Sequence, residues 1–337
     1  YITGLSGTQK SIFGYGYTNV NVSMTNLVSN TGVVSTDTTG VGSNKSLLAA
    51  AGYGTDKAIF GYGDASGVVS TTNLVSNTGI VATNTTGVGT ARYGLAAAGY
   101  GSDKAIFGYG YTGAYVSMTN LVSNTGVVAT DTTGVGTGRF ALAAAGYGSD
   151  KAIFGYGWTG AYVSMTNLVS NTGVVATDTT GVGTGRYLLA AAGYGSDKAI
   201  FGYGHPNVSM TNLVSNTGTV ATDTTGVGTA RHSLAAAGYG SNKAIFGYGL
   251  TSGVVSMTNL VSNTGVVATD TTGVGTARNA LAAARYGGDK AIFGFGGDSV
   301  NVSITNLVSN TGVVASDQTA LTGTVRFGLA AAGYSLT

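Results

Sequence analysis

Few side chains in this sequence are suited to acid–base or metal chemistry. It contains two histidines, His205 and His232, no cysteine and no glutamate, so all 13 acidic residues are aspartates. Most hydrolase mechanisms need a positioned general acid and base, and thiolate nucleophiles and cysteine-ligated zinc sites need cysteine. The repeated GVGTGR segment is glycine-rich, but no strand-to-helix phosphate loop surrounds it. We therefore expect no enzyme activity, no cofactor and no metal.

The 15 basic residues are ordered along the chain in two series, with Arg285 alone outside both. One consists of lysines that recur every 47 residues, with one spacing of 45: Lys10, Lys57, Lys104, Lys151, Lys198, Lys243 and Lys290. The other consists of Lys45 and six arginines: Arg92, Arg139, Arg186, Arg231, Arg278 and Arg326. The formal net charge is only +2, so no broad basic field indicates a nucleic-acid partner.

The six arginines allow two interpretations. They could form an anion-binding ring near a pore mouth. Alternatively, each guanidinium ties carbonyls at a strand end or pairs with the aspartate eight residues earlier in its own unit, where Asn84 substitutes once. We favour this structural ring, because a fixed, bidentate donor set explains why arginine holds six of the seven positions. Those acidic positions are Asp37, Asp131, Asp178, Asp223, Asp270 and Asp317.

The lysine spacing defines seven repeats that fill residues 1–337 as a single domain, with units starting near residues 10, 57, 104, 151, 198, 243 and 290. Turn residues divide each unit into four short segments, which in the third unit are residues 105–110, 116–125, 127–133 and 142–148. They are β-branched, alternating or made of small residues, and none keeps a helical period over ten residues. The sequence thus predicts an all-β protein.

Four strands in about 45 residues, repeated seven times, match the unit of a β-propeller blade. We predict a seven-bladed propeller of four-stranded antiparallel blades, with the small-residue LAAA segment innermost. The first unit begins at its second strand, so residues 329–334 should complete the first blade and close the ring. The leader YITGLSGTQ could compete for the same position. No stretch is apolar enough for a membrane helix, and we expect no membrane insertion.

The order of arginine, inner strand, hairpin, IFGYG, variable loop, long strand and NTG resembles the kelch repeat across all seven units. The motifs diverge from that family, since Gly-Tyr-Gly replaces adjacent glycines and no unit ends its third strand on tryptophan. The resemblance implies a propeller fold. Kelch-like propellers include copper oxidases, but the tyrosine–cysteine cofactor of those enzymes needs a cysteine, and none is present.

The seven units differ mainly in two places, the loop between the second and third strands and the two residues that follow the repeated arginine. In an up-and-down blade both lie at the same end, so one face of the disc should carry the variation, which is where repeat scaffolds usually bind ligands. Drift of unconstrained loops is the alternative explanation. The candidate ligand-binding residues are Tyr17, Asn19, Asp64, Tyr93, Tyr111, Tyr115, Phe140, Trp158, Tyr162, Tyr187, His205, Asn207, His232 and Asp298.

Exposed aromatic residues among Asn, Ser and Asp suit stacking on a sugar or contact with a protein. We therefore expect a non-enzymatic attachment module that recognises a glycan or protein through this face, on a virion or cell surface. The low charge and absence of glutamate favour an extracellular or virion location. The alternatives are a purely structural subunit assembled on a larger particle, an intracellular kelch-type adaptor, and a carbohydrate-active enzyme.

Overall fold

The computed structural model describes residues 8–298, 300–318 and 323–335, and every regular element in these ranges is a β-strand. The strands form seven antiparallel sheets of three strands each. We number these sheets along the chain: sheet 1 holds β21, β1 and β2, sheet 2 holds β3 to β5, and each later sheet takes the next three strands. The bounds are β1 (Lys10–Tyr17), β2 (Asn21–Val28), β3 (Ala49–Tyr53), β4 (Lys57–Gly61), β5 (Thr72–Val75), β6 (Ala96–Tyr100), β7 (Lys104–Tyr111), β8 (Tyr115–Val122), β9 (Ala143–Tyr147), β10 (Lys151–Gly155), β11 (Thr166–Val169), β12 (Ala190–Tyr194), β13 (Lys198–Gly202), β14 (Thr211–Val214), β15 (Ala235–Tyr239), β16 (Lys243–Gly247), β17 (Thr258–Val261), β18 (Ala282–Tyr286), β19 (Lys290–Gly294), β20 (Thr305–Val308) and β21 (Ala330–Tyr334).

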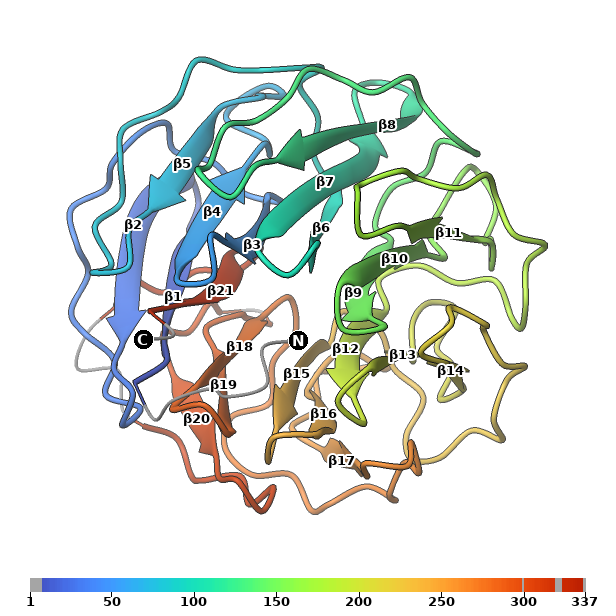
Figure 1. Ribbon diagram of the computed structural model, residues 1–337. Coiled ribbons are helices and arrows are strands. Elements are labelled where there is room, and N and C mark those ends of the chain that lie inside the picture. Colours follow the sequence, from blue (N-terminus) through green and yellow to red (C-terminus); the bar gives the residue numbers. More distant parts are fainter. Residues whose placement is uncertain (1–7, 299, 319–322, 336–337) are drawn as a thin grey trace.

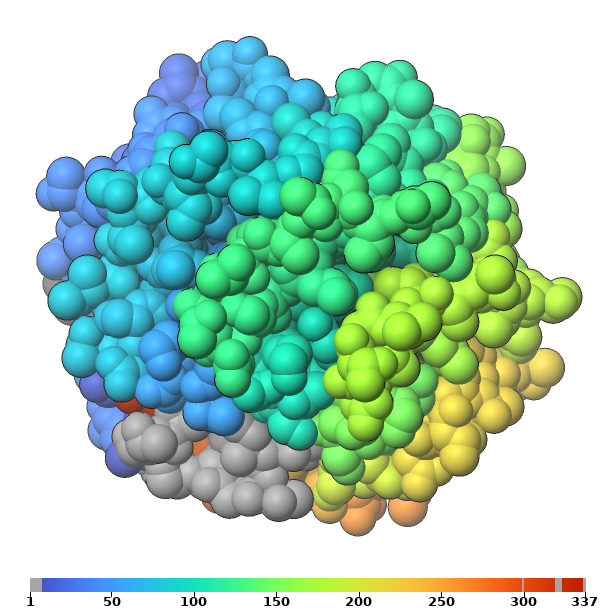
Figure 2. Space-filling model, turned by 45° about the horizontal axis from the view of Figure 1, so that its top comes forward, coloured from blue at the N-terminus to red at the C-terminus, as the bar shows by residue number. Residues whose placement is uncertain are grey.

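The sheets lie around a common centre in a propeller-like arrangement (Figure 1). The innermost strand of each sheet contacts its counterpart in the next, from β3 through β6, β9, β12, β15 and β18 to β21, which contacts β3. In the space-filling view of Figure 2, successive units lie directly against one another. The C-terminal strand β21 pairs with β1, with Lys10 opposite Tyr334 and Gly14 opposite Ala330. This is the pairing expected for residues 329–334, while residues 1–7 of the competing leader lie outside the described residues.

The predicted fourth strand of each unit is present only as an irregular outer segment. In sheet 3 it joins β8 through two isolated bridges, Val128 with Val122 and Thr132 with Thr119. The buried Asn120 side chain lies between the two segments, and its Nδ2 donates to the Ala129 carbonyl at 3.0 Å and to Asp131 Oδ1 at 3.0 Å. Because the Asn120 amide takes the Ala129 carbonyl, which a regular strand would offer to a backbone N–H group, the outer segment does not form a continuous ladder with β8 here.

Neighbouring sheets pack through a repeated contact between phenylalanine and glycine. The Phe154 ring of sheet 4 lies against Gly108 of sheet 3, where a Cβ atom would stand 2.8 Å from Phe154 Cζ. Phe154 is fully buried, and its ring centroid lies 5.3 Å from that of Tyr109. The same contact recurs around the ring and ends with Phe13 on Gly294. The glycine of the repeated IFGYG motif is therefore a packing position between two sheets.

The tyrosine of the same motif has an unusual backbone conformation. Tyr109 has a φ of 64° and Gly110 a φ of 118°, and residues other than glycine rarely adopt a positive φ. The pairing of β7 with β8 shifts register here, between Gly108 and Gly110. The resulting bulge buries the Tyr109 ring, and its hydroxyl donates to the Val135 carbonyl at 3.2 Å. Each sheet thereby holds the linker to the next.

Substituting the packing glycine tests this account of the core. We expect Gly108→Ala to lower the free energy of unfolding by about 1–3 kcal/mol, because the added methyl group must displace a fully buried ring. Gly146→Ala in β9 is the matched control, since its Cβ atom would meet nothing closer than 3.6 Å. Urea unfolding of both variants measures the difference. Equal midpoints for the two variants would contradict the proposed packing role.

Candidate binding site

The two variable segments of each unit pair directly with one another. The residue after the repeated basic residue forms an isolated antiparallel bridge with the residue that directly follows the Gly-Tyr-Gly or Gly-Phe-Gly motif of the same sheet. Both segments therefore lie at one end of every sheet, which we call the variable mouth. The pairs, in sheet order, are Phe327 with Tyr17, Ser46 with Asp64, Tyr93 with Tyr111, Phe140 with Trp158, Tyr187 with His205, His232 with Leu250, and Asn279 with Gly297.

A closed circle of seven backbone hydrogen bonds joins the sheets just inside these pairs. Each residue at the second variable position donates its N–H to the carbonyl of its counterpart in the preceding sheet, at 2.8–3.1 Å, and the circle closes when Leu47 donates to Gly328. All seven residues have positive φ, from 48° to 61°. These residues are Leu47, Gly94, Ala141, Leu188, Ser233, Ala280 and Gly328, and we call them the mouth ring.

The mouth ring lines a cavity of about 270 Å³, which we call the mouth cavity. Its wall also contains the leucine that begins each innermost segment, together with Tyr93 and Phe140. The cavity is central, because all seven sheets contribute to its wall. Its leucines are Leu48, Leu95, Leu142, Leu189, Leu234, Leu281 and Leu329.

Beside the mouth cavity, aromatic side chains of sheets 3 to 6 form a continuous series of ring contacts. Centroid distances run from 4.8 Å for Trp158 with Tyr162 to 6.2 Å for Phe140 with Tyr187. Two pairs between neighbouring sheets are nearly parallel, at 21°: Tyr115 with Phe140, and Tyr162 with Tyr187. We call this series the aromatic arc; it comprises Tyr93, Tyr111, Tyr115, Phe140, Trp158, Tyr162, Tyr187, His205 and His232.

Five of the predicted ligand-binding residues do not belong to the arc. Asn207 touches its end, with its Oδ1 2.6 Å from His232 Nδ1. Tyr17 contacts only Phe327 among the ring pairs of the described residues, at 5.5 Å. Asp64 accepts a hydrogen bond from the Gly67 N–H within its own loop at 2.9 Å. The remaining two, Asn19 and Asp298, are exposed. Most of the predicted acidic and amide side chains thus lie away from the aromatic ones.

The mouth cavity was not among the features predicted from the sequence. Leu47 is 45% exposed although its side chain is apolar, and Leu188 occupies the equivalent position in sheet 5. The available signal was the regular recurrence of a leucine before each small-residue segment. Within one repeat such a leucine is indistinguishable from any other strand residue, since only closure of the ring brings all seven to one place.

The repeated arginines are completely buried, and each one crosses between two sheets. The Arg92 guanidinium lies 4.2 Å from the ring centroid of Tyr62, in the preceding sheet. Arg92 also donates to the Thr90 carbonyl in the same linker and to two groups of sheet 3, which this linker enters: the Tyr109 carbonyl and Asn120 Oδ1. The three distances are 2.6–2.8 Å. The arginine therefore has a structural role, since it stacks on one sheet and hydrogen-bonds the next. Its guanidinium has no solvent-exposed surface that could bind an anion.

The acidic partner expected for each arginine was wrong. Arg139 pairs with Asp178 of the next unit, at 3.6 Å, and not with Asp131, eight residues earlier. Asp131 pairs with Arg92 at 3.8 Å and accepts hydrogen bonds from the Thr90 N–H and hydroxyl. Each aspartate lies in the outer segment of its sheet and contacts the linker that enters the same sheet, as Asp131 does with Thr90 and Arg92. The arginine therefore precedes its acidic partner by one whole sheet along the chain.

The single lysine of this series shares a sheet with the single asparagine. Lys45 enters sheet 2, where Asn84 holds the place of the aspartate. Lys45 is fully buried, and its Nζ donates to Asn73 Oδ1 at 2.8 Å and to the Thr71 carbonyl at 3.2 Å. Burial lowers the pKa of Lys45 to about 7. Sheet 2 has therefore replaced the arginine–aspartate pair by a smaller cation and a neutral amide.

Restoring the carboxylate should stabilise the protein. In Asn84→Asp, the new carboxylate should favour the charged form of Lys45, raise its pKa and add about 1 kcal/mol at neutral pH. Asp131→Asn in sheet 3 is the matched control, and it should destabilise by about 1–3 kcal/mol because it removes the carboxylate from a buried arginine.

Denaturant unfolding as a function of pH measures both effects. In the native protein the folded-state pKa of Lys45 lies below its ordinary value of 10.5. Burial of charged Lys45 therefore lowers the free energy of unfolding by its full amount below pH 7. This destabilisation decreases as the pH rises from about 7 towards 10.5, because the folded protein then holds Lys45 in its neutral form. The Asn84→Asp variant should lose part of this dependence. An unchanged pH profile would contradict the assignment.

The two histidines meet at the end of the aromatic arc. Their ring centroids are 5.0 Å apart and nearly perpendicular. Burial, and then the charge of His205, lower the pKa of His232. Neutral His232 is therefore favoured in the folded protein, and this part of the arc becomes less stable as the pH falls through the ordinary histidine range.

Titration of the imidazole resonances by NMR tests this arrangement. His232 should titrate below its ordinary value of 6.5, and His205→Phe should raise its pKa by removing the neighbouring charge while keeping an aromatic ring in place. A His232 pKa at or above 6.5 in the native protein would be incompatible with the packing of the two rings.

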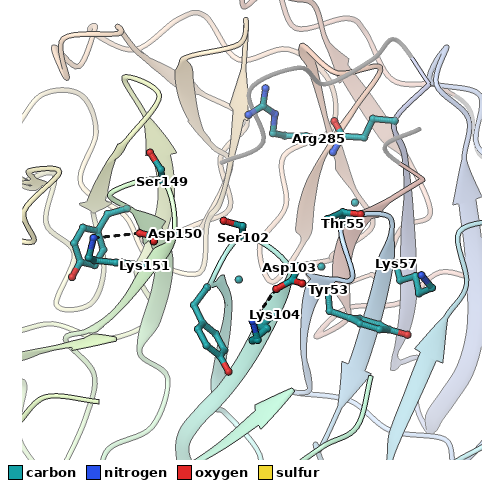
Figure 3. Close-up of a pocket in the computed structure, with 17 residues that line it drawn as sticks. Tyr53, Thr55, Lys57, Ser102, Asp103, Lys104, Ser149, Asp150, Lys151 and Arg285 are labelled. Carbon is teal, nitrogen blue, oxygen red and sulfur yellow. Dashed lines mark hydrogen bonds and ion pairs between the residues drawn. The ribbon is translucent and has the colours of Figure 1, made fainter. Parts of the chain in front are cut away.

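A second cavity lies at the end of the central axis opposite the variable mouth, and its wall is more polar. It measures about 350 Å³ and is lined by the turns between the first and second strands of the sheets. Figure 3 shows Thr55, Ser102 and Ser149 on successive turns, with Arg285 apart from them. The lysines beside these turns pair with the preceding aspartates, as in Lys104 with Asp103 at 3.0 Å. Arg285 stands where the other innermost strands have glycine, and its Nη2 donates to the Gly288 carbonyl at 2.9 Å.

No protein-family model matches this sequence, and comparison with curated proteins gives no match. Among the residues that the structure describes, no helix is long and apolar enough to cross a membrane. Within the same residues, no three His, Cys, Asp or Glu side chains gather as metal ligands would. The candidate site is therefore characterised by its own geometry, an aromatic and aliphatic surface with two histidines at one end.

Proposed function

We propose that this chain is a divergent kelch-like, seven-bladed β-propeller that acts as a non-enzymatic binding module through its variable mouth. The seven sheets would be the blades, and the irregular outer segments would be their fourth strands. The circular contacts of the innermost strands and the pairing of β21 with β1 support this architecture.

The observation that carries the functional proposal is the aromatic arc. Nine ring side chains are gathered on one end of the molecule, although the sequence places them in four different units. Tyr162 is 41% exposed, and exposed aromatic residues of this kind bind sugars or proteins. An attachment role on a virion or cell surface is the setting that we propose for such a face.

A specific feature supports the alternative, a structural subunit of a larger assembly. One aliphatic residue at the outer turn of most sheets is about two-thirds exposed, as Val127 is (67%). These turns follow the third strand and therefore lie at the end opposite the variable mouth. A repeated aliphatic ring suits docking on a particle; its members are Val33, Ile80, Val127, Val174, Val266 and Val313.

Substitutions in the arc separate the two functions. Binding to a printed glycan array and to a displayed library of cyclic peptides should weaken about tenfold or more in Trp158→Ala and Tyr111→Ala, as expected for aromatic contact residues. Tyr17→Ala is the matched control, since Tyr17 has the same loop position as Tyr111 but lies outside the arc. Binding that survives both arc substitutions, or self-association that only a Val127→Ser change disrupts, would favour the structural alternative.

A further inference from the structure

The mouth cavity has an apolar wall whose backbone groups are already hydrogen-bonded. Each residue of the mouth ring uses its N–H towards one neighbouring sheet and its carbonyl towards the other. The side chains around them are mainly Leu, Ala and Gly, with Ser233 contributing a hydroxyl. A sugar placed here would leave most of its hydroxyl groups without hydrogen-bond partners, and each buried hydroxyl group without a partner weakens binding.

The wall of the mouth cavity carries no formal charge in the part of the chain that the structure describes, and in the arc only His205 and His232, at its end, can become charged. Among the described residues, no Asp, Lys or Arg lines the mouth cavity, and the six repeated arginines are fully buried. Asp64 is occupied in its own loop, and Asp298 is exposed and outside the arc. The chemical complement of this surface is uncharged, which disfavours acidic sugars, nucleic acids and charged peptides.

The size of the mouth cavity further restricts the ligand. Pockets that enclose a whole small molecule usually measure about 300–1,000 Å³, whereas this cavity measures about 270 Å³. It suits one side chain or a group of similar size. An apolar pocket bordered by aromatic residues and depleted of charge is the arrangement in which protein interfaces concentrate their binding energy.

We propose that the partner is a protein which inserts one apolar side chain, of leucine or phenylalanine size, into the mouth cavity and lays uncharged flanking residues on the aromatic arc. This inference rests on the proposed binding function and chooses between its two ligand classes. The arc and the mouth cavity form one site, because Tyr93 and Phe140 belong to both.

Small neutral probes can test the mouth cavity directly. Trp158 is the only tryptophan and lies in the arc, so its fluorescence reports this site alone. N-acetyl-leucinamide and N-acetyl-phenylalaninamide should change that fluorescence at concentrations at least tenfold lower than N-acetyl-alaninamide does. A cyclic peptide of Ser, Gly and Asn with one Leu at its tip should bind at least tenfold more tightly than N-acetyl-leucinamide, and Tyr111→Ala should remove this gain.

One substitution should fill part of the mouth cavity without imposing a backbone conformation that the new side chain does not already adopt elsewhere in the mouth ring. Ala141 has a φ of 52°, and leucine already occupies the equivalent position at Leu47 (51°) and Leu188 (53°). Ala141→Leu should therefore fold normally while filling part of the mouth cavity, and it should weaken binding of the leucine probes at least tenfold. Ala141→Ser, which copies the serine found at Ser233 (53°), is the matched control that leaves the space open.

The outcomes distinguish this inference from the proposed function. Binding of the leucine probes that Ala141→Leu abolishes and Ala141→Ser preserves would support it. Binding of a neutral oligosaccharide such as cellohexaose that Tyr111→Ala abolishes and Ala141→Leu does not affect would overturn it, while leaving the binding function intact. Failure of every leucine and phenylalanine probe to bind would also overturn it.

Discussion

The buried arginine between neighbouring sheets is the interaction on which this architecture depends. A guanidinium removed from water needs hydrogen-bond partners, and each of these arginines donates through both Nη atoms to segments that the chain must bring together. The Nε of Arg92, Arg231 and Arg278 donates as well, whereas the Nε of Arg139, Arg186 and Arg326 has no partner among the described residues. Arg92 stacks on the tyrosine of the preceding sheet, Tyr62, and hydrogen-bonds the carbonyl of its own Gly-Tyr-Gly tyrosine, Tyr109, and a buried asparagine, Asn120. These partners are correctly placed only when two adjacent sheets and the linker between them are all formed. The cost of burying the charge therefore couples folding of each unit to that of its neighbour.

The same requirement explains two features that a simple strand would not need. The tyrosine adopts a left-handed conformation so that its ring lies under the next guanidinium, and the phenylalanine before it packs on a glycine of the preceding sheet. The outer segment is irregular because it delivers an aspartate and a carbonyl to side chains instead of extending a ladder. Sheet 2 shows how these positions depend on one another, since the change to lysine at residue 45 accompanies the change to asparagine at residue 84.

Because the backbone groups of the mouth ring pair with one another, the variable mouth can change without disturbing the frame. The mouth ring makes the same backbone hydrogen bonds whether the residue is Leu, Gly, Ala or Ser. Side chains on this ring and in the adjoining loops therefore alter the surface at little cost to the fold. A repeat scaffold with this property is well suited to present different surfaces from nearly identical units.

Much of the fold could be predicted from the sequence, because a period of 47 residues, strand-forming segments and turn residues are local features. They determined the all-β class, the seven units, the pairing of the C-terminal segment with the first unit and the end of the molecule at which the units differ. Only the tertiary structure decided which residues meet. Arg139 could not be assigned to Asp178 from spacing within one unit, and the nine rings of the aromatic arc could not be separated from Asp64 or Asp298. The mouth cavity likewise could not be predicted from the sequence, since its seven leucines come from seven units and meet only when the ring of sheets is closed. Contacts between units depend on the angle between neighbouring sheets around the common centre. Packing between sheets sets that angle, and the sequence of a single repeat does not contain this information.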